Sequence, residues 1–243
     1  MEIGGLEKST LIDYPAKVAC TVFLIGCNFR CPFCYSAELV LPEKIKLQPR
    51  ISEKEFFDFL KKRKSLLEGV VVCGGEPTLN KDLPDFIKKI KKLGYRVKLD
   101  TNGSNPEMLK ELIKKKLLDY VAMDIKAPRG AKFPIPNSQF QKYDEATGVK
   151  ADLNKIKKSI KIIKDSGIDY EFRMTVVPAI HAKKDIIQIA KEISPAKKFY
   201  LQNFRPEKTI NPKFEKIKPY SKDFLLEIKE EIAGFFDICE VRG

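Results

Sequence analysis

Three closely spaced cysteines stand in the stretch Gly26-Cys27-Asn28-Phe29-Arg30-Cys31-Pro32-Phe33-Cys34-Tyr35, and no fourth cysteine follows at ligand spacing. In a reducing cytosol, such a compact CxxxCxxC group is more often metal-binding than disulfide-bonded. A structural zinc site needs four closed ligands, and ferredoxin-type iron–sulfur centres also take four cysteines. Three cysteines in one loop would therefore hold three irons of a [4Fe-4S] cluster and leave the fourth iron open to a substrate.

A zinc site completed by a distant cysteine is the alternative at this point. The remaining thiols are Cys20, Cys73 and Cys239. Cys20 and Cys239 fall inside apolar runs and are interpreted as core residues. Cys73, which precedes a Gly-Gly turn, is interpreted as a packing residue that could lie near the cluster. Three spare cysteines are too few for two further ferredoxin-like clusters, so the sequence predicts one cluster.

The cysteine stretch follows the first of six apolar strand patterns, and amphipathic helix patterns alternate with them. The strand patterns cover 18–25, 70–72, 95–101, 120–125, 168–177 and 199–204, and 237–241 is expected to form a short closing strand. The helix patterns begin at capping residues such as Ser52 and Asn105. They cover 52–67, 83–93, 106–117, 153–163, 185–193 and 221–235.

Six alternating strand–helix units predict an α/β protein with a parallel sheet and right-handed crossovers. Eight units would close a TIM barrel, so about six indicate a partial, open one. A single domain is expected at 1–243, with a lead-in at 1–17, a βα core at 18–204 and a C-terminal helix and short strand at 205–243. The connection at 127–150 is long, which is typical of functional lids or binding segments.

Unusual polar residues gather at or near the carboxyl ends of the predicted strands. The carboxyl ends of parallel strands form the active-site face of such architectures. The sequence therefore predicts one site at this edge of the sheet. Besides the cysteines, its members in chain order are Gly74-Gly75-Glu76-Pro77, Asp100-Thr101-Asn102, Asp124, Lys126, Arg173, Gln202 and Asn203.

Composition limits the location and the partners. The chain is 43% hydrophobic and 33% charged, and it has neither an apolar run of the ~18 residues that span a membrane nor a signal-peptide pattern at its start. A cytoplasmic globular protein without membrane contact is expected. The net charge of +13 suits an acidic protein or a nucleic acid. Because many lysines fall in helical runs such as 114–116, where they would only solvate an outer face, nucleic acid is disfavoured.

The order of these motifs resembles that of radical S-adenosylmethionine (SAM) enzymes over nearly the whole chain. It is most similar to the activating enzymes of glycyl-radical enzymes, namely the activases of pyruvate formate-lyase and of anaerobic ribonucleotide reductase. The opening GGLEKSTLIDYP at 4–15 and the later MDIKAP at 123–128 resemble the reductase-activating branch in particular.

The resemblance implies a radical SAM oxidoreductase in which Cys27, Cys31 and Cys34 hold a [4Fe-4S] cluster whose open iron binds SAM. The reduced cluster would give one electron to SAM, and the resulting 5'-deoxyadenosyl radical would take a hydrogen from a glycine Cα of a partner enzyme under anaerobic conditions. The implied partners are a glycyl-radical enzyme, expected to be anaerobic ribonucleotide reductase, and a flavodoxin or ferredoxin-type electron donor. No catalytic side chain is expected beyond the cluster and SAM.

By the same resemblance, the turn Gly74-Gly75-Glu76-Pro77 holds the SAM amino group, with Glu76 as an orienting anion. Paired glycines suit this role because they let the backbone approach a ligand closely. An ordinary strand-to-helix turn is the alternative.

The charged strand ends have a second implied role. Lys126 would pair with the SAM carboxylate, and Asp100, Thr101 and Asp124 would bind a monovalent cation beside it. Asn102 belongs to the same strand end. A structural salt bridge between Lys126 and an aspartate is the alternative from the residues alone.

Three further positions are interpreted from their place in the pattern. If Arg173 faces the barrel interior, its guanidinium needs an anion such as SAM or a carboxylate; otherwise it pairs with Glu171 or a helix. Gln202, Asn203 and Phe204 are expected to contact the ribose and adenine through amide hydrogen bonds and stacking. His181, the only histidine, is predicted to lie on the surface in a loop, and a catalytic triad is unsupported.

Two departures from the family pattern leave the target open. Tyr35 and Ser36 stand where the activases commonly have His-Asn, and the connection 127–150 is longer than usual. The alternative function is therefore a radical SAM enzyme that acts on a small molecule or nucleobase, similar to carboxy-deazaguanine synthases. A non-catalytic metal-binding or RNA-binding module is a third possibility, but it leaves the strand-end residues unexplained.

Overall fold

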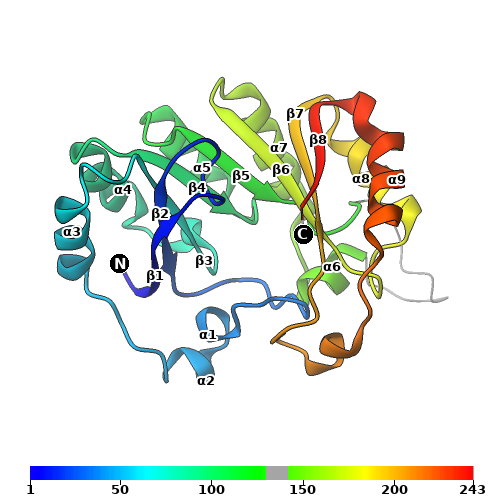
Figure 1. The fold of residues 1–243 in the computed structure, drawn as a ribbon, viewed down its shortest axis with the longest axis horizontal. Coiled ribbons are helices and arrows are strands. Elements are labelled where there is room, and N and C mark those ends of the chain that lie inside the picture. Colours follow the sequence, from blue (N-terminus) through cyan, green and yellow to red (C-terminus); the bar gives the residue numbers. More distant parts are fainter. Residues whose placement is uncertain (130–141, 243) are drawn as a thin grey trace.

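The computed structural model describes residues 1–129 and 142–242, and its eight strands form one sheet in which neighbouring strands follow the order of the sequence (Figure 1). Strands β2 to β8 are parallel, whereas β1 runs antiparallel to β2. Among the described residues, β8 does not pair with β1, so the curved sheet remains an open, partial barrel. The strands are β1 (Ile3–Thr10), β2 (Ala19–Leu24), β3 (Gly69–Gly74), β4 (Arg96–Thr101), β5 (Tyr120–Asp124), β6 (Asp169–Val176), β7 (Ala196–Asn203) and β8 (Phe236–Arg242).

The longer helices connect successive parallel strands and cover the outer face of the sheet (Figure 1). The α-helices are α1 (Ala37–Val40), α2 (Pro42–Ile45), α3 (Glu53–Lys62), α4 (Leu83–Lys92), α5 (Pro106–Lys114), α6 (Lys142–Thr147), α7 (Leu153–Asp165), α8 (Lys183–Ile193) and α9 (Lys222–Ile232). Short 3₁₀ turns are η1 (Pro77–Leu79), η2 (Pro212–Lys216) and η3 (Ala233–Phe235).

The predicted fold class is confirmed, because the six strand–helix units and the closing strand are all present. The expected caps form as well: the Ser52 side chain accepts a hydrogen bond from the N–H of Glu55, and the Asn105 side chain accepts one from Met108. Strands covered by helices are buried almost throughout, as in β2, where only Phe23 is partly exposed.

The segment 1–17, which was interpreted only as a lead-in to the βα core, contains the strand β1. Only Ile3 and Thr10, at the two ends of the strand, are buried. An edge strand that pairs on one side has no need of the continuous apolar run that marks a covered strand. The long connection 127–150 also contains a helix, α6, while its residues 130–141 lie outside the described part of the chain.

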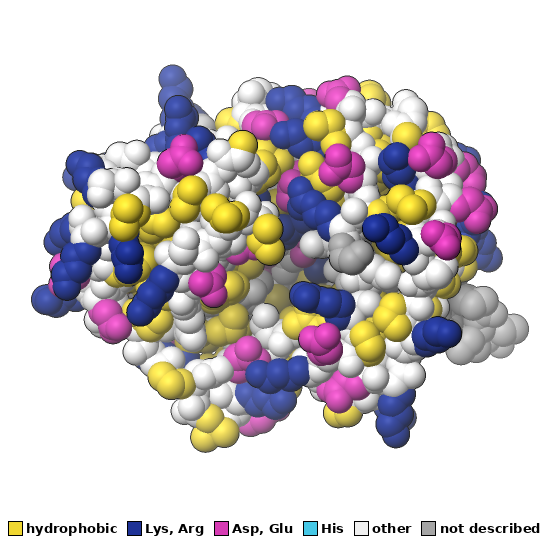
Figure 2. Space-filling model, in the orientation of Figure 1, with side chains coloured by type: hydrophobic (Ala, Val, Ile, Leu, Met, Phe, Trp, Pro, Cys, Tyr) yellow, Lys and Arg dark blue, Asp and Glu magenta, His cyan; other side chains and the backbone are white. Residues whose placement is uncertain are grey.

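The surface bears on location and partners. No helix among the described residues combines the length and the apolar character needed to cross a membrane. On the face shown in Figure 2, Lys and Arg side chains are spread widely instead of gathering in one patch. This distribution agrees with the expectation that many of them solvate helix surfaces.

Candidate functional site

The cysteine loop (residues 26–35) leaves β2 at the carboxyl edge of the sheet. Cys27, Cys31 and Cys34 line one cavity of about 140 Å³, together with the glycine pair that ends β3. Among the described residues, no three His, Cys, Asp or Glu side chains converge around a point that would suit a single metal ion. The thiols surround a cavity, and this arrangement fits a polynuclear cluster, in which each iron takes its own thiolate.

Backbone hydrogen bonds from two distant segments hold the cysteine loop. The N–H of Arg30 donates to the carbonyl of Thr147, at the end of α6, over 2.7 Å. On the other side, two N–H groups of segment 210–211 donate to the carbonyls of Pro32 and Cys34, each over 3.0 Å. The main chain of the loop is therefore fixed from both sides.

Two glycines permit these close contacts. A Cβ on Gly75 would lie 2.0 Å from the Gly26 carbonyl oxygen, at the start of the cysteine loop. Gly148 has a φ of +66°, and a Cβ there would lie 2.2 Å from the Arg30 carbonyl oxygen. Both contacts are possible only because glycine lacks a side chain. The Gly-Gly turn thus packs against the cysteine loop and lines the cavity at the same place.

Burial keeps the cysteine thiols protonated when no metal is bound. It raises the pKa of Cys27 to about 11 and that of Cys31 to about 12. The nearby ammonium of Lys126 opposes this effect and favours the thiolate form of both. Because metal ligands must be deprotonated, this positive charge assists the binding of a metal centre.

Glu76 binds groups of the chain itself. Its buried carboxylate accepts hydrogen bonds from the N–H and the hydroxyl of Thr78, from the hydroxyl of Thr101 at 2.8 Å and from the N–H of Asn102 at 2.6 Å. Burial raises the pKa of Glu76, while these four donors favour its anion. Glu76 therefore joins the turn after β3 to the end of β4, and Pro77 starts η1 beside it.

Asn102 extends this connection to the cysteine loop. Its Nδ2 donates to Asn28 Oδ1 over 3.1 Å and lies 3.9 Å from Cys27 Sγ. Asn102 and Thr101 are both buried and line the small cavity. The predicted grouping of these strand ends around the cysteines is therefore present in the structure.

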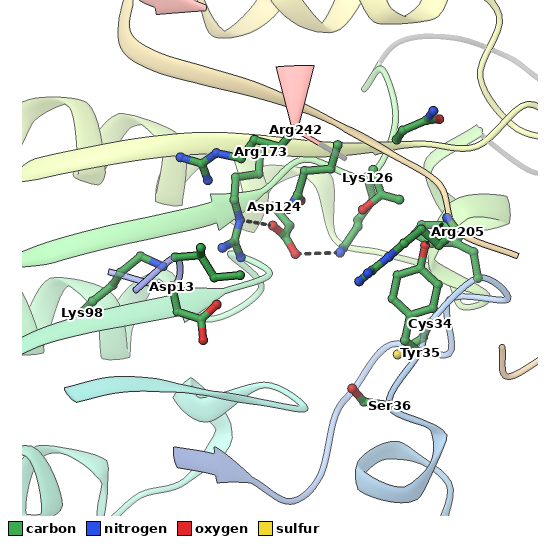
Figure 3. Close-up of a pocket in the computed structure, with 15 residues that line it drawn as sticks. Asp13, Cys34, Tyr35, Ser36, Lys98, Asp124, Lys126, Arg173, Arg205 and Arg242 are labelled. Carbon is green, nitrogen blue, oxygen red and sulfur yellow. Dashed lines mark hydrogen bonds and ion pairs between the residues drawn. The ribbon is translucent and has the colours of Figure 1, made fainter. Parts of the chain in front are cut away.

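Five charged side chains from β4, β5 and β6 form what we call the strand-end ion cluster. The Arg173 guanidinium lies between two carboxylates, with Nη1 2.8 Å from Asp100 Oδ2 and Nε 2.9 Å from Asp124 Oδ1. Lys98 Nζ lies 2.6 Å from Asp100 Oδ1. Lys126 Nζ lies 3.0 Å from Asp124 Oδ2, as Figure 3 shows. Arg173 thus faces the barrel interior, and Lys126 forms the salt bridge with an aspartate that was the alternative to SAM binding in the sequence analysis.

The charges of this cluster stabilise one another. Burial alone would raise the pKa of Asp100 and Asp124, but the neighbouring cations, Arg173 first, outweigh it and hold both below the usual range. Burial likewise opposes the charge on Lys126, but Asp124 holds its pKa above the usual value. The two carboxylates remain ionised and Lys126 remains protonated at neutral pH.

A second cavity of about 470 Å³ adjoins the ion cluster on the open side of the barrel (Figure 3). Gln202 and Asn203, which were expected to contact the ribose and adenine, both line it. Arg242 also lines it and pairs with the buried Glu171, with Nη2 3.2 Å from Oε2. The cavity is thus large, polar and rich in cations, which suits an anionic or highly polar ligand.

Several residues lining this cavity were not assigned a site role from the sequence, among them Tyr35, Arg205 and Lys98. The Tyr35 hydroxyl accepts a hydrogen bond from the N–H of Arg205 over 2.8 Å, and the Arg205 guanidinium lies 5.8 Å from the Tyr35 ring centre. No sequence pattern joins these two positions. Lys98 could have been found, because it alternates with the buried Val97 and Leu99 and so shares the face of Asp100.

The prediction that His181 lies on the surface is wrong. The side chain is fully buried between the end of β6 and the start of α8. Its Nδ1 accepts a hydrogen bond from the Val177 N–H over 3.0 Å, and its Nε2 lies 2.8 Å from the Lys126 carbonyl oxygen. Because both ring nitrogens have partners, the imidazole is buried without leaving an unpaired polar atom.

The donor set fits the two cofactors that the sequence pattern implies. Three thiols surround one cavity, as an iron–sulfur cluster with one open iron requires. Backbone groups of Gly74 and Gly75 and the Lys126 ammonium line the same cavity, where a ligand that carries both an amino group and a carboxylate finds partners for each.

Comparison with known proteins supports this interpretation. The model of the Radical SAM superfamily matches residues 21–193. A Methanocaldococcus jannaschii protein, named provisionally as a glycyl-radical enzyme activating enzyme, is 33% identical over 99% of this chain and 95% of its own length. A 7-carboxy-7-deazaguanine synthase of Aquifex aeolicus is 34% identical, but over only 33% of this chain and 34% of its own.

Solved structures show the same fold at low sequence identity. SuiB of Streptococcus suis bound to S-adenosylmethionine aligns with a TM-score of 0.65 and 17% identity, over 92% of this chain and 52% of the SuiB chain. QueE of Escherichia coli aligns with a TM-score of 0.53 and 14% identity, over 98% of this chain and 92% of its own.

Proposed function

This chain belongs to the radical SAM superfamily, and we propose that it is an activase that generates a glycyl radical on a partner enzyme, anaerobic ribonucleotide reductase. The observation that carries the proposal is the near full-length similarity to the M. jannaschii protein, because the two chains match over almost their entire lengths. The family implies a [4Fe-4S] cluster and SAM. The activase role, the identity of the partner and the anaerobic conditions are the parts that we propose beyond the family.

Cys27, Cys31 and Cys34 are proposed to hold the cluster in the small cavity, with the Lys126 ammonium favouring their thiolate forms. When bound, the cluster would supply one electron for the reductive cleavage of SAM, and this chemistry would serve to remove a hydrogen atom from the target glycine. The protein positions both partners and limits solvent access. The fixed main chain of the cysteine loop supports this role, because a cluster site must keep its shape during the reaction.

The SAM site is proposed at the boundary of the two cavities. Gly74 and Gly75 would present backbone groups to the amino group, and Lys126 would bind the carboxylate. Gln202 lies farther along the larger cavity, where it would contact the nucleoside. Glu76 would support the SAM site indirectly, because its carboxylate accepts hydrogen bonds from Thr101 and Asn102 at the end of β4.

A monovalent cation at Asp100, Thr101 and Asp124 remains part of the proposal. The Arg173 guanidinium already bridges the two carboxylates, and the Thr101 hydroxyl donates to Glu76. A cation would therefore share these oxygens with Arg173. If SAM binding proves equal in sodium, potassium and tetramethylammonium buffers, the cation has no role.

The decisive experiment uses the anaerobically reconstituted protein, dithionite or a flavodoxin or ferredoxin-type donor as reductant, SAM, and a glycyl-radical enzyme encoded beside this gene. We expect an EPR doublet of a glycyl radical on the partner and stoichiometric 5'-deoxyadenosine. The doublet should disappear when the target glycine is replaced by alanine. If 5'-deoxyadenosine forms and no such partner acquires a radical, the activase role is wrong.

A second candidate is a radical SAM enzyme that acts on a small molecule or nucleobase. The similarity to the Aquifex carboxy-deazaguanine synthase favours it, as does a 24% identity over 88% of this chain to a protein of Thermococcus kodakarensis named as a probable GTP 3',8-cyclase. The two candidates differ in what accelerates SAM cleavage. For this candidate, a small molecule such as GTP or a nucleobase should accelerate SAM cleavage. For the first candidate, only the partner protein should do so.

A further inference from the structure

The buried His181 connects two segments that leave the sheet at the carboxyl edge. It lies in the loop between β6 and α8, and its ring reaches the Lys126 carbonyl, just after β5. The last ladder contact of β5 is the hydrogen bond from the Ile125 N–H to the Arg173 carbonyl, at 2.8 Å. One residue later the main chain leaves the sheet, and His181 holds it there.

The hydrogen-bond partners determine the protonation of the ring. A backbone N–H can only donate, so Nδ1, which faces the N–H of Val177, carries no proton. A backbone carbonyl can only accept, so Nε2, which faces the oxygen of Lys126, carries the proton. The imidazole is therefore neutral and donates its single N–H to Lys126.

The hydrogen bond from His181 also affects Lys126 in the ion cluster. The Lys126 ammonium lies 3.0 Å from Asp124 and faces the cavity that the cysteines line. A lysine side chain has four rotatable bonds, and its position depends on where the main chain starts it. Fixing the Lys126 carbonyl restricts the direction in which the ammonium can reach.

We propose that His181 is a positioning residue, which holds Lys126 so that its ammonium meets the carboxylate of SAM. The inference rests on the proposed function, since it requires that Lys126 binds this carboxylate. It adds a residue that touches neither the cluster nor the ligand and that acts through one main-chain hydrogen bond.

The first test is spectroscopic and needs no cofactor. Since His181 is the only histidine in the sequence, ¹⁵N-histidine labelling of the protein, prepared without a polyhistidine tag, gives one imidazole whose two nitrogens can be assigned directly. We expect a neutral ring protonated at Nε2 at pH 7. A ring protonated at Nδ1, or a charged ring, would overturn the proposed hydrogen bond.

The second test is a double-mutant cycle read out as the dissociation constant for SAM, measured by calorimetry on the reconstituted protein. Removing the ring in His181→Leu should weaken SAM binding by about tenfold, the size of one hydrogen bond. Lys126→Met should weaken it at least as much. The double variant should bind no more weakly than Lys126→Met alone, because His181 acts through Lys126.

The matched control is Tyr95→Phe, which removes another buried side-chain donor, the Tyr95 hydroxyl that reaches the Leu60 carbonyl at 2.6 Å. It should lower thermal stability without changing SAM affinity. If His181→Leu behaves like this control, or if its effect adds to that of Lys126→Met, the positioning role is wrong. If Lys126→Met itself leaves SAM affinity unchanged, the assigned role of Lys126 in the proposed function fails as well.

Discussion

The cysteine loop and the strand-end ion cluster face each other across one cavity, but they are held in different ways. The loop is fixed by main-chain hydrogen bonds from α6 and from segment 210–211, and by glycines that permit close approach. The ion cluster is fixed by side chains, with Arg173 bridging Asp100 and Asp124. The side of the site that is proposed to bind the cluster therefore depends on backbone shape, and the other side depends on charge balance.

The largest effect is expected from replacing one of the three cysteines that are proposed to hold the cluster. Cys31→Ala should abolish iron loading and all SAM cleavage, because two thiolates cannot hold three irons. Iron content and 5'-deoxyadenosine measure the two losses. Cys239→Ala is the control: Cys239 is a buried thiol on β8, and its replacement should leave both quantities close to wild type. An unchanged iron content in Cys31→Ala would show that the cysteine loop is not the cluster site.

The second prediction addresses charge balance. Arg173→Gln should destabilise the protein by less than the ~3–5 kcal/mol of a fully buried pair, because it leaves two partly buried carboxylates without their shared cation. Urea unfolding measures the change. Arg96→Gln is the matched control, since it removes an arginine–aspartate pair with Asp119 in which the Arg96 side chain is 63% exposed, and it should change stability little.

A small effect of Arg173→Gln would mean that Lys98 and Lys126 suffice to balance the two aspartates. The ion cluster would then tolerate the loss of its central member, and its geometry would have to depend on the backbone as well. The contrast between the two regions would be weaker than the hydrogen bonds suggest.

Sequence patterns predicted the strand-end ion cluster better than the contacts that hold the cysteine loop. Asp100, Asp124 and Arg173 were placed at one edge because strand periodicity assigns a face and an end to every residue. The hydrogen bonds to Thr147 and to segment 210–211 could not be foreseen, because any residue supplies a backbone N–H and a carbonyl.

The same reasoning explains why β1 was not predicted and why the prediction for His181 was wrong. Strand β1 lacks a covered face and so leaves no apolar run in the sequence. His181 was placed at the surface because its burial depends on two distant backbone groups, the N–H of Val177 and the carbonyl of Lys126. Local sequence carries no signal for either contact.

The third prediction tests the backbone region with a matched pair of glycines. Gly148 and Gly167 have similar φ values, +66° and +74°, but an added Cβ meets the Arg30 carbonyl only at Gly148 and open space at Gly167. Gly167→Ala should therefore cost about 1 kcal/mol for the left-handed backbone alone. Gly148→Ala should cost about 2 kcal/mol more, because the loop must move to relieve the contact.

Urea unfolding measures both costs, and iron content after reconstitution shows whether the shift reaches the cysteines. Only Gly148→Ala should lose iron. Equal costs and full iron loading in both variants would mean that α6 does not hold the cysteine loop, which would remove one of its two supports.

The smallest effect concerns the pH dependence of stability. It distinguishes the titration of His181 from that of the two aspartates of the ion cluster. Burial lowers the pKa of His181 from 6.5 to about 4, while Asp185 favours its charged form and Lys142 and Lys126 oppose it. The unfolded chain therefore binds a proton that the folded chain excludes between pH 6.5 and about 4. The free energy of unfolding should decrease as the pH is lowered through this window, by about 2 kcal/mol from pH 7 to pH 5.

Asp100 and Asp124 affect stability only at lower pH. Their pKa values lie below 3.8, so the stability that they contribute is complete above that value and is lost only beneath it. His181→Gln has no titrating ring, and its urea-unfolding free energy should lack the decrease assigned to His181. If the pH dependence persists in His181→Gln, the loss of stability in acid arises from groups other than His181.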